Sequence, residues 1–120
     1  MDYHKRIVEY YNATEHAYRD SWDLDNSLAI HYGYWDENVS SFPASLVRMN
    51  EVMAEQAGIL PGERVLDAGC GVGGSSIFLA SVRGATVTGI TLSARQVQKA
   101  TANAMEKSAE ANVNFQVMDY

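Results

Sequence analysis

The chain has 120 residues and a mass of 13.2 kDa, enough for one domain around one hydrophobic core. Nine lysines and arginines against 15 aspartates and glutamates give a net charge of −6, so we expect no nucleic-acid partner. The N-terminus lacks a signal-peptide pattern, and no apolar run approaches the ~20 residues of a bilayer span, so we expect a cytoplasmic protein without a transmembrane segment.

The first half of the chain is aromatic and predicts a helical cap over residues 1–57. Asp2 is placed to cap a helix that ends near residue 12, and Thr14 to cap a second helix that ends near residue 22. Residues 23–26 break the helical pattern, and residues 30–35 are typical of a loop. A third helix is expected from Pro43, at its first position, to Ala57, with Gly58 as the stop.

Residues 58–120 change to alternating short strands and helices. The expected elements are strands at 64–67, 86–90 and 113–118 and helices at 73–82 and 93–109, the last capped by Ser93. This order predicts an α/β fold: the first half of a doubly wound, Rossmann-like parallel sheet with three strands and flanking helices.

The turn after the first strand carries the strongest functional signal. Gly69, Gly71 and Gly74 fit the pattern G-x-G-x-x-G between a strand and a helix, where such sheets admit a nucleotide-type ligand. The alternative is that these glycines serve only a tight turn. A pyrophosphate would favour the helix N-terminus, but Asp67 places a like charge nearby and therefore favours a cationic ligand without a phosphate bridge.

An NADP-dependent oxidoreductase is a competing interpretation. An NAD enzyme needs an acidic residue at the end of the second strand. Residues 90–93 of this chain, Ile90 to Ser93, include no Asp or Glu. Arg95 could instead receive the 2′-phosphate of NADP, although a solvated residue in the first turn of a helix is the simpler interpretation.

Three segments resemble one enzyme family. Residues 65–74 (VLDAGCGVGG) resemble the first motif of class I S-adenosylmethionine-dependent methyltransferases. Residues 89–93 (GITLS) with Gln96 are similar to the cyclopropane fatty acid synthase, sterol and tocopherol methyltransferase group, and residues 31–36 (HYGYWD) resemble the segment that leads into its cofactor site. The resemblance covers the chain from about Leu28 onward. It implies S-adenosyl-L-methionine as the cofactor, and residues 58–120 as the first half of the domain that binds it.

The resemblance also implies roles for single residues. Asp67 would orient the ammonium of the cofactor, and Asp119 would accept from the adenine amino group. Tyr32, with Tyr34 and Trp35, would close over the sulfonium, or else form the core of the cap. The remaining implied contacts are Gly69, Cys70 and Gly71 at the methionine part, Thr91 and Leu92 at the adenosine, and Gln96 at the ribose hydroxyls.

The implied function is methyl transfer to a small acceptor, which we take to be lipophilic. We assign no catalytic residue, no nucleophilic role to Cys70 and no metal. The first strand would lie at an exposed edge of the half-sheet, so we expect self-association there or pairing with a missing C-terminal half. The chain would then be an inactive fragment by itself. The alternative from another class is a non-catalytic half-domain that acts as an assembly module.

Overall fold

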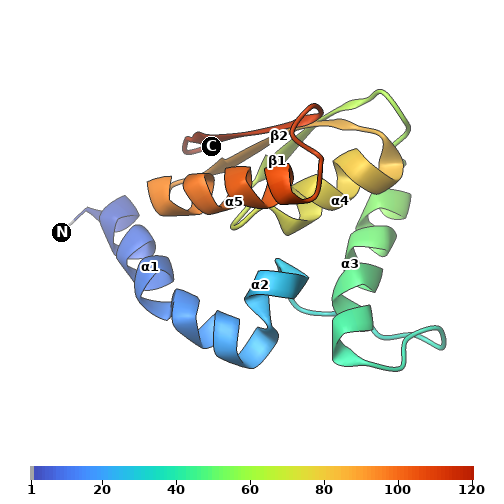
Figure 1. Ribbon diagram of the computed structural model, residues 1–120, viewed down its shortest axis with the longest axis horizontal. Coiled ribbons are helices and arrows are strands. Elements are labelled where there is room, and N and C mark those ends of the chain that lie inside the picture. Colours follow the sequence, from blue (N-terminus) through green and yellow to red (C-terminus); the bar gives the residue numbers. More distant parts are fainter. Residues whose placement is uncertain (1) are drawn as a thin grey trace.

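The computed structural model describes residues 2–120 and contains five helices and three strands in that range. Three helices precede the sheet, and two connect its strands (Figure 1). In chain order the elements are α1 Tyr3–Trp22, α2 Leu24–Ser27, α3 Phe42–Ala57, β1 Arg64–Ala68, α4 Gly74–Arg83, β2 Thr86–Thr91, α5 Ala94–Glu106 and β3 Val113–Val117.

The first helix is longer than the sequence suggested. Asp2 caps α1 as expected, accepting from the amide of His4 at 3.1 Å. The prediction of a second cap at Thr14 was wrong, because its hydroxyl donates to the carbonyl of Tyr10 at 2.8 Å, one turn back within a continuous helix. The expected break at residues 23–26 falls almost wholly within the short helix α2.

The other helix ends follow their local signals with small shifts. Ser41 caps α3, so Pro43 is its second residue rather than its first, and Gly58 ends it in a left-handed conformation with φ 66°. Ser93 caps α5 by accepting from the amide of Gln96. That helix stops at Glu106, three residues earlier than expected, and Ser108 then takes a positive φ of 56°.

The sheet is parallel throughout, with the strand order β1-β2-β3. Both crossovers run in the same direction, so α4 and α5 cover the same face of the sheet (Figure 1). Val87 and Ile90 of the central strand are fully buried, while Leu66 of the edge strand β1 is 61% exposed. The expected parallel sheet of three strands, with the first strand at an edge among the described strands, is therefore confirmed.

Candidate functional site

A cavity of about 700 Å³ lies at the carboxyl ends of the strands, where parallel α/β sheets bind their ligands. Helix α1 supplies one of its walls through a stripe of five residues on successive turns. Eight of the nine predicted site residues also line it: Asp67, Gly69, Cys70, Gly71, Thr91, Leu92, Gln96 and Asp119. The structure therefore brings these residues around one space, as the sequence predicted.

The glycine turn combines exposed backbone with tight packing. Gly69 and Gly71 have positive φ angles of 83° and 56°, and a side chain at Gly69 would meet no atom within 4 Å. The backbone at Gly69 therefore borders open space that a ligand can enter, whereas a Cβ at Gly71 would lie 3.6 Å from Cδ1 of Ile30. Gly74 differs, because a Cβ there would lie 2.2 Å from the carbonyl oxygen of Leu28. This glycine serves the packing of the N-terminal segment on the turn.

The carboxylate of Asp67 reaches the cavity from the end of β1. Its Oδ2 accepts a 2.6 Å hydrogen bond from the hydroxyl of Ser76, a fully buried residue in the first turn of α4. Burial, with a smaller contribution from the nearby Asp67, raises the pKa of the Cys70 thiol to about 12. Cys70 is therefore a neutral thiol at physiological pH, which agrees with giving it no nucleophilic role.

At the end of β2, Thr91 holds the side chain of Gln96 on α5 in a fixed orientation. The hydroxyl of Thr91 donates to Oε1 of Gln96 at 2.6 Å and also accepts from the amide of Ser93. Since this bond occupies the carbonyl oxygen of Gln96, a ligand beside it would meet the NH₂ group, which is a donor.

Asp119 has partners that the sequence analysis missed. Its Oδ2 lies 3.0 Å from Nε2 of His4, and its Oδ1 accepts from the amide of Tyr120 at 2.9 Å. His4 belongs to the α1 stripe on the cavity, whose other members are Tyr3, Ile7, Val8 and Tyr11. Their spacing of three and four residues on a predicted helix was the available signal for this wall.

The three aromatic rings of the loop at residues 30–35 do not line the cavity. Tyr32 is 80% exposed, and its ring lies 6.0 Å from that of Trp22 on α1. Tyr34 and Trp35 are also exposed and do not line the cavity. The expectation that these rings close the site is thus not met in this structure; their neighbours Ile30 and His31 line the cavity instead.

Comparison with known proteins identifies the family. The model of the mycolic acid cyclopropane synthetase family matches residues 2–120. The chain belongs to this family. The resemblance to class I S-adenosylmethionine-dependent methyltransferases is therefore confirmed, and with it the Rossmann-like fold.

Individual relatives agree with this assignment. The chain is 35% identical to tocopherol O-methyltransferase of Arabidopsis thaliana over 127 residues, covering 96% of this chain and 35% of that protein. It is 27% identical to geranyl diphosphate C-methyltransferase of Streptomyces coelicolor, solved with S-adenosyl-L-homocysteine, with a TM-score of 0.72 over 99% of this chain and 49% of that one. The cyclase SpnF is 30% identical, with a TM-score of 0.78 over 97% of this chain and 42% of that one. The chain spans 35% to 41% of the length of three curated relatives it matches.

The charges around the cavity of this family member bear on the oxidoreductase alternative. Among the described residues, Asp67 and Asp119 line it and no Lys or Arg does. Arg95 pairs with the buried carboxylate of Glu15 at 2.5 Å, from α5 to α1. The possible receptor for a 2′-phosphate is thus engaged elsewhere, and the comparisons give the NADP interpretation no support.

The described residues also bear on metals and membranes. In residues 2–120, no three His, Cys, Asp or Glu side chains are grouped so that they could hold a metal ion. None of the helices in the same range is long and apolar enough to cross a membrane.

Proposed function

We propose that this chain binds S-adenosyl-L-methionine and is the cofactor-binding part of a methyltransferase that acts on a small, lipophilic acceptor. The observation that carries the proposal is the charge of the cavity, which has two carboxylates and no Lys or Arg among its described lining residues. A ligand with an ammonium and a sulfonium suits this space, whereas a pyrophosphate would lie among like charges. Family membership supports the same conclusion.

Each end of the cavity suits a different part of the cofactor. Asp67 and the open backbone at Gly69 would hold the methionine part, and the NH₂ group of Gln96 would donate to the ribose hydroxyls. Asp119 would accept from the adenine amino group while it shares its carboxylate with His4. The bound cofactor supplies an electrophilic methyl group, so the protein contributes mainly orientation and the exclusion of water.

The apolar part of the cavity wall supports a lipophilic acceptor. Ile7 and Val8 of α1 line the cavity together with Leu28, Ile30 and Met53. An acceptor with a hydrocarbon or aromatic body would bind more tightly by removing these apolar side chains from water. The cytoplasmic location stays a prediction.

We also propose that the chain acts as part of a larger assembly. Strand β1 pairs only with β2 among the described strands, and Leu66 is exposed on it. Such an edge can pair with a further strand, from a second copy or from a C-terminal half of the domain. Size-exclusion chromatography with light scattering tests this: a monomer that persists at all concentrations would contradict self-association.

Calorimetric titration tests the cofactor. We expect S-adenosyl-L-homocysteine to bind and NADPH not to bind, and we expect Asp67→Asn to weaken binding by about tenfold through loss of a charge-assisted bond. Glu63→Gln is the matched control, because Glu63 lies outside the cavity and its carboxylate accepts from the amide of Leu60. Binding of NADPH in place of S-adenosyl-L-homocysteine would refute the proposal, and binding of neither would favour the assembly-module alternative.

A further inference from the structure

The hydrogen bond between Ser76 and Asp67 joins a buried residue to the proposed cofactor site. Ser76 has no exposed surface, and its Oγ lies 2.6 Å from Oδ2 of Asp67. A carboxylate has no proton to give, so the serine hydroxyl is the donor and the bond is charge-assisted. Ser76 does not line the cavity, whereas Asp67 does.

This bond makes the two carboxylate oxygens of Asp67 different from each other. Oδ2 accepts from Ser76, whereas Oδ1 makes no hydrogen bond to the described residues. Rotation about the bond between Cβ and the carboxyl carbon would break the contact to Ser76, so the hydroxyl fixes the plane of the carboxylate. Oδ1 is then presented in one orientation to a ligand in the cavity.

The neighbouring serine provides a contrast. Ser75 lines the cavity, yet its hydroxyl donates to Oδ1 of Asn50 on α3 at 2.6 Å. Two adjacent serines of α4 thus make bonds of equal length to different partners. Only Ser76 is bonded to a group that we assign to the cofactor.

We propose that Ser76 is a positioning residue, which holds Asp67 so that Oδ1 accepts from the α-ammonium of the cofactor. This inference rests on the proposed function, since it assigns the ammonium to Asp67. Ser76 acts through Asp67 and does not touch the ligand. Its removal should therefore affect only ligands that carry the ammonium.

The experiment compares two ligands by calorimetric titration of the 120-residue chain. One is S-adenosyl-L-homocysteine, and the other is its desamino analogue, which lacks the ammonium and is otherwise the same. Ser76→Ala should weaken binding of the first by about tenfold, because an unfixed carboxylate loses much of a charged hydrogen bond. It should leave the affinity for the analogue within about twofold. Ser75→Ala, the matched control, should change the ratio of the two affinities by less than about twofold.

The outcomes are distinct. Equal weakening of both ligands by Ser76→Ala, or no weakening of either, would overturn the positioning role. If Ser76→Ala does not fold, as judged by circular dichroism, Ser76→Cys keeps nearly the same volume with a much weaker donor, and the same selective loss is expected. If the unsubstituted chain binds neither ligand, the proposed function fails, which is a different result from the loss of selectivity.

Discussion

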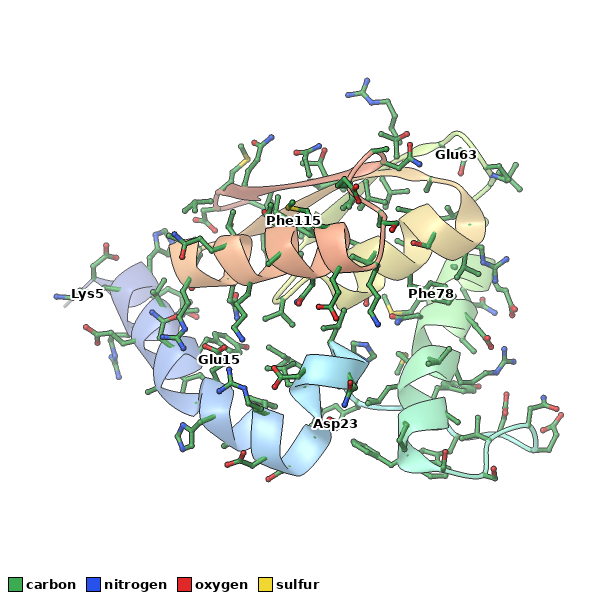
Figure 2. All side chains as sticks on the ribbon, viewed as in Figure 1. Lys5, Glu15, Asp23, Glu63, Phe78 and Phe115 are labelled. Atoms are coloured by element: carbon green, nitrogen blue, oxygen red, sulfur yellow. The ribbon has the colours of Figure 1, made fainter. Side chains whose placement is uncertain are left out.

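The buried carboxylate of Glu15 offers the sharpest test of how α1 is held on the rest of the molecule. The Glu15 side chain, which Figure 2 labels, is 9% exposed. It accepts from Arg19 at 3.1 Å and from Arg95 at 2.5 Å, and Lys99 lies at 3.3 Å. Arg95 and Lys99 belong to α5, so this carboxylate joins the first helix to the last one.

The magnitude follows from how exposed the partners are. Removing one member of an enclosed ion pair costs about 3–5 kcal/mol, because a charge stays buried without a partner. Here the three cations are between 36% and 56% exposed and can regain water. We therefore expect Glu15→Gln, which keeps the size and removes the charge, to lower the free energy of unfolding by about 2 kcal/mol at pH 7.

The effect should depend on pH in a defined direction. Burial alone would raise the pKa of Glu15, but hydrogen bonds and charge interactions with Arg95 and Lys99 outweigh it and lower the pKa below the ordinary value of 4.5. A lowered pKa means that the carboxylate contributes its full stability above pH 4.5 and loses it as the pH falls through the folded-state pKa. The stability gap between the two proteins should therefore close in acid.

Urea unfolding followed by circular dichroism measures this gap between pH 7 and pH 3. Glu9→Gln is the control: Glu9 is 54% exposed on the same helix, with Lys5 at 3.9 Å, so its loss should change stability by less than about 0.5 kcal/mol. A gap below that value for Glu15→Gln at pH 7, or one that persists unchanged at pH 3, would refute the reasoning.

Three further outcomes follow from single contacts. Gly74→Ala should lower the free energy of unfolding by about 2–3 kcal/mol, because its Cβ would overlap the carbonyl oxygen of Leu28. An unchanged midpoint of thermal unfolding would contradict that packing. With its pKa raised to about 12, Cys70 should react with iodoacetamide at pH 8 roughly a thousandfold slower in the folded chain than in urea, and equal rates would contradict its burial. His4→Ala should change the free energy of unfolding by less than about 1 kcal/mol in the same urea assay, because His4 and Asp119 are both half exposed; a larger loss would show that this pair anchors α1.

The features predicted correctly from the sequence are those encoded by nearby residues. Caps at Asp2 and Ser93 and the stop at Gly58 act within one helical turn, so they could be read along the chain. The strands at 64–68, 86–91 and 113–117 bring the predicted residues together, because the carboxyl ends of parallel strands lie on the same side of the sheet.

The features that the sequence analysis missed involve side chains that could contact either of two partners. The hydroxyl of Thr14 can cap a following helix or bond back to the preceding turn, and the sequence does not distinguish the two. Tyr32 could lie over the cavity or against Trp22, and the path of the loop decides this. The pair of His4 and Asp119 joins residues at opposite ends of the chain, so only the folded structure brings them together.

The attachment of α1 has a consequence for ligand binding. Polar contacts at three positions of this helix hold it to the rest of the molecule: His4 to Asp119, Asn12 to Ser93, and Glu15 to Arg95 and Lys99. Only the last involves a buried carboxylate, and the first lies at the end of the cavity where we propose that the adenine binds. A ligand that donates to Asp119 would share this carboxylate with His4, in a half-exposed pair that costs little to open. The buried carboxylate of Glu15 would still hold the helix to α5 if the pair at its N-terminal end opened.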